Sequence, residues 1–176
     1  ANWERTVDLP ASSSTLGPPF LLPTGDGSVF AAWTNGAKDK RFLEITRSAD
    51  SGLTFPSPLI KMSAVTPNSQ FGLQKPRFSA DGEGNIYLVW EEAKTLVDFL
   101  IYLNRSSDWG KTWADQPVIL NPKREGMYNA QSPQVVAAPK GRIYVLWEQY
   151  VVSNHQPAKA QLNFDLVLSF NRSDDY

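Results

Sequence analysis

Few side chains in this sequence are of a type, or at a spacing, that catalysis or metal binding requires. The chain has 176 residues, no cysteine and a single histidine, His155. Thiolate catalysis, disulfides, cysteine-ligated zinc and a multi-histidine metal site are therefore excluded, and we expect no metal and no cofactor. The chemistry that remains belongs to arginine, glutamate and tyrosine, and includes the gripping of a carboxylate by a guanidinium group through paired hydrogen bonds.

Seven residues are candidates for contact with a ligand. Glu91 and Glu148 each follow a tryptophan in the same local pattern, where a further copy of the pattern has Thr34. Arg77 also differs from the residues at the matching positions of the other copies. The simpler alternative is that Arg77 pairs with a neighbouring carboxylate and that the other candidates are solvated rim residues. The full set is Arg77, Glu91, Arg124, Tyr128, Glu148, Tyr150 and His155.

The segments that contain these residues recur along the chain. Trp33, Trp90 and Trp147 lie 57 residues apart. A proline precedes each tryptophan by 14 residues, and a glycine precedes each by 6. Between glycine and tryptophan the segments read SVFAAW, NIYLVW and RIYVLW. Three features at the same offsets in three copies identify an internal repeat.

A second motif follows each tryptophan. It reads SADSGLTF from residue 48 and SSDWGKTW from residue 106, and a third copy begins with SDDY at residue 173. The aspartate suits a tight turn because it accepts backbone hydrogen bonds, the glycine allows positive φ, and the last aromatic ring buries apolar area. We therefore expect a structural role for Ser48, Asp50, Gly52, Thr54, Phe55, Ser106, Asp108, Gly110, Thr112, Trp113, Ser173 and Asp175.

Each copy is predicted to be a four-stranded antiparallel meander. In the second copy, strands are expected at PRFSA, IYLVW, FLIYLNRS and PVIL. No segment has a convincing helical period with caps. Four-stranded units repeated at this interval are typical of propeller blades. We predict an all-β fold, a β-propeller segment of about three blades near residues 10–62, 63–120 and 121–176.

Ligand-binding loops are expected at one end of these blades. Hairpins of a meander alternate between the two ends of the sheet. The hairpin with the SxDxGxT pattern joins the third and fourth strands, so it lies at the same end as the turn between the first and second strands. The segments 34–40, 91–98 and 148–162 then lie at the opposite end, and the last carries an insertion of about ten residues. Variable loops on a constant scaffold are where function usually lies.

The pattern Ser-x-Asp-x-Gly-x-Thr-Trp/Phe resembles the Asp box, or bacterial neuraminidase repeat, of sialidase-like propellers. The resemblance covers essentially the whole chain and implies the architecture rather than catalysis. In sialidase-like propellers the face opposite the boxes holds the substrate. Arg77 would then resemble one member of the arginine cluster that binds a sugar carboxylate, although its local sequence KPRF differs from the family motif. Tyr128 or Tyr150, with Glu148, would resemble the tyrosine–glutamate nucleophile pair.

Composition and resemblance together favour a binding module. With 17 basic and 18 acidic residues, the formal charge of -1 argues against a nucleic-acid partner, and no apolar run is long enough to span a membrane. We predict a non-catalytic carbohydrate- or protein-binding or scaffold module, with its glycan or protein ligand opposite the boxes. The alternative is part of an exo-α-sialidase-type glycoside hydrolase. The resemblance implies a secreted or periplasmic location.

The two ends of the repeat pattern suggest further partners. Residues 1–9 match the strand that follows a box, and residues 121–176 contain three of a blade's four strands. We therefore expect residues 1–9 to complete a neighbouring blade. The chain is expected to form a homodimer or to belong to a longer propeller chain, because three blades are too few to close a ring.

Overall fold

The computed structural model describes residues 6–9, 17–36, 41–56, 60–63, 69, 72–95, 98–121, 127–154 and 163–173. Within these residues the chain is all β, and its strands form three antiparallel sheets, here called blades 1, 2 and 3. Blade 1 contains β1 (Phe20–Pro23), β2 (Val29–Asn35), β3 (Phe42–Ser48) and β4 (Ile60–Ser63). Blade 2 contains β5 (Leu73–Ala80), β6 (Ile86–Thr95), β7 (Asp98–Ser106) and β8 (Val118–Ile119). Blade 3 contains β9 (Met127–Ala138), β10 (Arg142–Asn154) and β11 (Asn163–Ser173).

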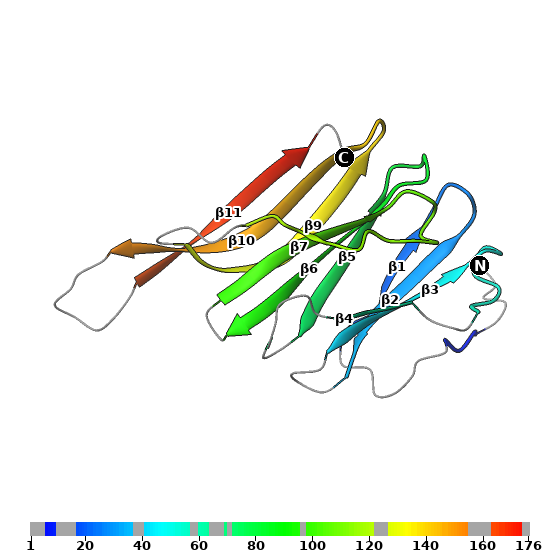
Figure 1. Cartoon of the computed structure of the whole chain (residues 1–176), viewed down its shortest axis with the longest axis horizontal. Coiled ribbons are helices and arrows are strands. Elements are labelled where there is room, and N and C mark those ends of the chain that lie inside the picture. The colour runs from blue at the N-terminus through cyan, green and yellow to red at the C-terminus, as the bar shows by residue number, and fades with distance from the viewer. Residues whose placement is uncertain are drawn as a thin grey trace.

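Each blade is a meander in which consecutive strands pair. Blades 1 and 2 have four strands in chain order, and the described part of blade 3 has three. The blades lie side by side in chain order across the molecule (Figure 1). β5 contacts both β1 and β9, so the first strands of the three blades share one edge of the stack. The predicted all-β propeller segment of antiparallel blades is confirmed.

The core lies between the blades rather than inside one of them. One cluster joins blades 1 and 2, with Phe30 and Leu43 on one side and Leu88 and Trp90 on the other. A second cluster joins blades 2 and 3 through the other face of blade 2. β6 is therefore covered on both faces, which explains its unbroken apolar run. Sheet-on-sheet packing of this kind makes each blade depend on its neighbours.

The second strands are longer than the sequence pattern suggested. Segments 91–98 and 148–162 were expected to be loops, but β6 continues to Thr95 and β10 continues to Asn154. The ladder with the third strand also continues, and Glu91 pairs with Ile101. The extension occurs because backbone groups near the core must find hydrogen-bond partners, which the adjacent strand supplies. Glu91, Glu148 and Tyr150 therefore lie in strands.

A bulge interrupts the first strand of blades 2 and 3 at matching positions. The registers shift between Gln74 and Arg77 in β5 and opposite Leu146 and Glu148 in β9. The residues before the repeated prolines, Lys75 and Ser132, have positive φ of 47° and 55°. Proline has no N–H to donate to the ladder, so a bulge is where a strand accommodates it. These bulges lie at the end of the blades opposite the SxDxGxT hairpins.

The role expected for the start of the chain, completing a neighbouring blade with residues 1–9, stays a prediction. Residues 6–9, the described part of this segment, belong to no strand in the single chain. An extended segment becomes a strand only where a sheet edge accepts its hydrogen bonds, and none of the three blades pairs with these residues.

Candidate functional site

The two complete SxDxGxT hairpins have nearly identical hydrogen bonds. In blade 2, Asp108 accepts from the backbone N–H of Thr112 at 2.9 Å and from its hydroxyl at 2.6 Å. The buried Ser106 hydroxyl accepts from the backbone N–H of Gly110 at 2.8 Å and donates to Asp108 at 2.8 Å. Asp50, Ser48, Gly52 and Thr54 repeat these contacts in blade 1. Every one of these polar groups is engaged in closing its own turn.

The carboxylates of these hairpins are stabilised in their charged form. Hydrogen bonds from the Thr112 hydroxyl and backbone N–H hold the pKa of Asp108 at about 2, against an ordinary 3.8. The hydroxyls of Ser48 and Thr54 likewise hold the pKa of Asp50 at about 2. A carboxylate with so low a pKa is a poor proton carrier at neutral pH. This electrostatics suits a turn rather than an acid–base site.

The arginine before each hairpin ties it to the neighbouring turn of the same blade. Arg47 forms an ion pair with Asp26 at 2.9 Å, and Arg105 donates to the side-chain oxygen of Asn85 at 2.7 Å. Burial raises the pKa of Asp26, but hydrogen bonds from Thr24, Ser28 and Arg47 outweigh it and lower the pKa to about 2. These contacts connect the two turns at the hairpin end of each of these blades.

Buried carboxylates next to the repeated tryptophans also have structural partners, which the sequence did not reveal. Trp33 donates its indole N–H to Glu44 at 2.8 Å, and Trp90 donates to Glu92 at 2.8 Å. In blade 3 the acceptor is the neutral side chain of Gln149, at 3.2 Å from Trp147. An acceptor is needed at each site because a buried indole N–H without one is costly.

The end opposite the hairpins contains a link between blades 2 and 3. Glu91 is 1% exposed and accepts the backbone N–H of Ser132, in the bulge of blade 3, at 2.8 Å. Its other oxygen lies 3.3 Å from Nζ of Lys75, in the bulge of its own blade. Glu91 was expected to face a ligand, and that expectation is wrong because both of its oxygens are used inside the protein.

The matching position between blades 1 and 2 contains a cavity instead of a carboxylate. Thr34 takes the place of Glu91, and Lys75 takes the place of Ser132. Beside them lies a cavity of about 160 Å³. Its lining includes three basic residues and no carboxylate, and consists of Gly17, Pro18, Thr34, Arg41, Gln74, Lys75, Pro76 and Arg77. We call it the bulge cavity.

The two arginines of the bulge cavity have spare hydrogen-bond donors. The guanidinium of Arg77 lies 5.6 Å from the centre of the Phe20 ring and donates to the carbonyl oxygen of Pro76 at 2.9 Å. Its expected alternative, a salt bridge to a neighbouring carboxylate, does not occur among the described residues. The Nε–H of Arg41 is buried without an acceptor in the described part of the chain. Buried unpaired donors of this kind suit an anionic partner.

The candidates drawn from the sequence include Arg77 but neither Arg41 nor Lys75, which line the same cavity. Arg41 stands next to an expected loop, and nothing in its local pattern marks it. A comparison of the repeat copies contained a usable signal, since Thr34 breaks the Trp-Glu pair that recurs at Glu91 and Glu148.

The remaining candidates lie elsewhere. Glu148 and Tyr150 are two residues apart on β10 and therefore share a face of blade 3, and Tyr128 pairs with Tyr150 in the ladder. That face points away from blade 2 and thus from Arg77. Arg124, His155 and Asp175 lie outside the described residues.

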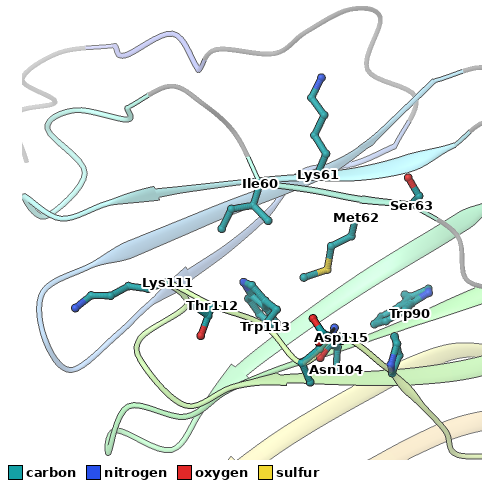
Figure 2. Close-up of a pocket in the computed structure, with 12 residues that line it drawn as sticks. Ile60, Lys61, Met62, Ser63, Trp90, Asn104, Lys111, Thr112, Trp113 and Asp115 are labelled. Carbon is teal, nitrogen blue, oxygen red and sulfur yellow. Dashed lines mark hydrogen bonds between the residues drawn. The ribbon is translucent and has the colours of Figure 1, made fainter.

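A larger cavity lies between the outer strands of blades 1 and 2. It measures about 350 Å³, and β4 and the end of the blade 2 hairpin frame it, with Trp90 and Trp113 in its wall (Figure 2). A similar gap of about 180 Å³ recurs between β8 and blade 3. Its recurrence indicates that neighbouring blades diverge away from their shared inner edge, so the gap is a product of the architecture.

Within the described ranges, no three His, Cys, Asp or Glu side chains gather closely enough to hold a metal ion. The described residues also contain no helix that could cross a membrane.

Comparison with known proteins supports the architecture. No family model and no curated protein sequence matches the chain. Among solved structures, the chain is similar to the GH93 α-L-arabinofuranosidase of Fusarium graminearum in complex with arabinobiose, with a TM-score of 0.63 and 14% identity. The fold is that of a β-propeller. The match covers 94% of this chain and 49% of the other, so the chain spans about half the length of that enzyme.

Proposed function

We propose that this chain is a carbohydrate-binding module of an Asp-box propeller that holds an acidic sugar by its carboxylate in the bulge cavity. The observation that carries the proposal is a difference between two repeats. At the interface of blades 1 and 2, Thr34 stands at the position that Glu91 has at the interface of blades 2 and 3. Where the glutamate is present, its carboxylate accepts a backbone N–H of the next bulge and faces a lysine. Where it is absent, Arg41 and Arg77 line a cavity instead.

A carboxylate from a ligand would meet positively charged donors in the bulge cavity, as Glu91 meets Lys75. The lining supplies two guanidinium groups, which bind a carboxylate through paired hydrogen bonds. Similarity to a glycoside hydrolase propeller supports a carbohydrate-related module, and the Asp-box resemblance supports a ligand on this side of the blades. Location in a secreted or periplasmic compartment rests on the same resemblance.

Titration with galacturonate and with galactose tests the ligand class, because the two sugars differ by one carboxylate. We expect galacturonate to bind and galactose to bind at least tenfold more weakly, as follows from the loss of charge-assisted hydrogen bonds of about 1.5–3 kcal/mol. Arg77→Met should weaken galacturonate by a similar factor. Lys111→Met removes an exposed charge at the hairpin end and should leave affinity unchanged. Equal affinity for both sugars would contradict the proposal.

A second variant tests whether the ligand carboxylate lies beside Thr34 in the bulge cavity. Thr34→Glu places the protein's own carboxylate where Glu91 lies in the next interface. It should abolish galacturonate binding and raise the melting temperature, whereas Thr34→Gln, of similar size but uncharged, should do neither to the same extent. Retained binding in a folded Thr34→Glu protein would show that the ligand lies elsewhere.

Part of a sialidase-like hydrolase is a second candidate function. The pairing of Tyr128 with Tyr150, and the position of Glu148 two residues before Tyr150, favour it. However, Arg77 lies at a different blade interface from these three residues. We therefore expect no hydrolysis of a fluorogenic sialoside by this chain. Turnover above a heat-treated sample that is lost in Tyr128→Phe or Tyr150→Phe would favour the hydrolase instead.

A further inference from the structure

The larger cavity between the outer strands of blades 1 and 2, here called the outer cavity, has mostly apolar walls. Ile60 and Met62 point from β4 towards the indole of Trp113, whereas Lys61 points away from it (Figure 2). Ile60, Met62 and Trp113 all pack against the core that joins the two blades. The volume of about 350 Å³ is that of a small-molecule site. The divergence of the blades opens the gap, but the side chains that line it decide what it can hold.

One polar group in the wall of the outer cavity has no partner. The indole N–H of Trp113 is buried, and no acceptor lies within hydrogen-bond distance of it in the described part of the chain. The repeated tryptophans differ, because Trp33, Trp90 and Trp147 donate to side-chain oxygens at 2.8 Å, 2.8 Å and 3.2 Å. A buried donor without an acceptor is costly, so its presence calls for an explanation.

The fold does not require this N–H. In the blade 1 hairpin the position of Trp113 is occupied by Phe55, which supplies an aromatic ring without a donor. The ring of Trp113 packs edge-on against Phe78 at 6.2 Å between centroids, and a phenyl ring can make the same kind of contact. The indole nitrogen is therefore not needed to close the hairpin or to pack the core.

The other polar groups that line the outer cavity are engaged or hydrated. Asn104 uses its amide nitrogen and its oxygen on backbone groups, at 3.0 Å and 2.7 Å, and the Thr112 hydroxyl donates to Asp108 at 2.6 Å. Lys111 and Asp115 are exposed to solvent. A ligand rich in hydroxyl groups would leave several of them unpaired here, which is unfavourable. The lining instead suits an apolar ligand with a single hydrogen-bond acceptor.

We propose that the outer cavity binds a small aromatic molecule with one hydrogen-bond acceptor, which receives the indole N–H of Trp113. The ligand ring would lie between Met62 and the indole, because sulfur and aromatic surfaces both attract an aromatic ring. A small rotation of the tryptophan ring about its second side-chain torsion, which has a broad minimum, turns the N–H towards the acceptor. No described residue lines both this cavity and the bulge cavity, so the inference does not depend on the acidic sugar proposed there.

Acetophenone and ethylbenzene test the proposal, because they have nearly the same size and only acetophenone carries a carbonyl acceptor. NMR resonances of the indole N–H groups report the titration at each tryptophan, and the Trp113 resonance is the one that Trp113→Phe removes. We expect acetophenone to bind about threefold or more tightly than ethylbenzene and to move the Trp113 resonance downfield. Burial of apolar surface alone favours ethylbenzene. Equal or tighter binding of ethylbenzene would therefore overturn the proposal.

Trp113→Phe removes the donor and keeps an aromatic ring that the blade 1 hairpin already accepts at this position. It should abolish the preference for acetophenone and leave the affinity for ethylbenzene within about twofold. Leu53→Ala, at a position of the blade 1 hairpin that is 67% exposed, is the control and should change neither affinity. A preference for acetophenone that persists in folded Trp113→Phe would show that another group binds the carbonyl, and would overturn the proposal.

A variant that fills the outer cavity locates the ligand without reference to the indole N–H. Met62→Trp places a larger side chain in the cavity and should weaken both probes about tenfold or more. Galacturonate should bind Met62→Trp as before, whereas Arg77→Met should weaken galacturonate and leave acetophenone unchanged. Failure of one site can thus be told from failure of the other. Unchanged affinity for acetophenone in folded Met62→Trp would place the ligand elsewhere and overturn the proposal.

Discussion

At the scale of single residues, each hairpin has a serine and an aspartate that accept hydrogen bonds from donors of different burial. Ser106 is 1% exposed and receives the buried N–H of Gly110, whereas Asp108 receives the exposed N–H of Thr112. Water can replace a lost partner at an exposed donor but not at a buried one. The serine, rather than the aspartate that gives the motif its character, should therefore matter more for stability.

Paired alanine variants test this difference. We expect Asp108→Ala to cost about 1 kcal/mol and Ser106→Ala to cost about 2–3 kcal/mol in the free energy of unfolding. Denaturant melts measure both. Binding of galacturonate to the folded variants should not change, since the hairpins lie at the other end of the blades. A loss of binding with unchanged stability in Asp108→Ala would mean that this carboxylate contacts ligand.

The low pKa values predict how stability responds to acid. The folded-state pKa of Asp26, Asp50 and Asp108 is about 2, below the ordinary 3.8. Each carboxylate therefore stabilises the fold fully above pH 4, and this contribution is lost as the pH falls towards 2. Melting temperatures between pH 5 and pH 2 should decline, and the decline should be shallower in Asp108→Asn. An unchanged slope would contradict the bonded state of Asp108.

At the scale of elements, the same glycine has different surroundings in the two hairpins. Gly52 and Gly110 both have positive φ, 89° and 73°. A Cβ on Gly52 would find only Val29 Cγ2, at 3.9 Å. A Cβ on Gly110 would overlap Cε1 and Cζ of Phe30, a fully buried ring of blade 1. The blade 2 hairpin is thus part of the interface between blades, whereas Gly52 of the blade 1 hairpin contacts no other blade among the described residues.

Alanine substitutions at these two glycines should distinguish the cost of backbone strain from the cost of overpacking in the free energy of unfolding. Gly52→Ala should cost about 1–2 kcal/mol through its backbone conformation, and Gly110→Ala should cost about 1–3 kcal/mol more through overpacking. Thermal or denaturant unfolding measures the difference. Phe30→Leu, which shortens the opposing side chain, should recover part of the extra cost only in Gly110→Ala. Equal costs at both glycines would contradict the contact with Phe30.

At the scale of the whole molecule, stability should decrease from blade 2 to blade 3. Blade 2 contributes to both interblade cores, while blade 3 contributes to one. Repeat units of this kind gain stability from each neighbour they contact. The third strands β7 and β11 are equivalent in the repeat, so a comparison between them controls for local structure.

Native-state hydrogen exchange should show this gradient directly. We expect amides of β7 to exchange at least tenfold more slowly than those of β11, because β11 opens without breaking a second interface. Uniform protection across both strands would indicate that the three blades unfold as one unit.

The architecture can be predicted from the sequence pattern alone. A tryptophan, a proline and a glycine at constant offsets specify the repeating unit, and alternating strands with one hairpin chemistry specify its antiparallel form. These signals are readable because they are local: turn residues such as Asp108 act on atoms four residues away. The aspartate turns follow from these short-range rules, whereas the burial of β6 on both faces requires the packing of blades 1 and 3.

The roles of the polar residues at the end opposite the hairpins became clear only from the packing of the blades. Glu91 and Glu148 occupy the same position of the repeat, yet one binds the bulge of the next blade and the other stands on an open face. Arg41 joins Arg77 at the bulge cavity although 36 positions separate them in the sequence. The physical reason is that these contacts cross between blades. A blade-to-blade contact depends on which sheet packs on which face, and no local pattern within one blade records that choice.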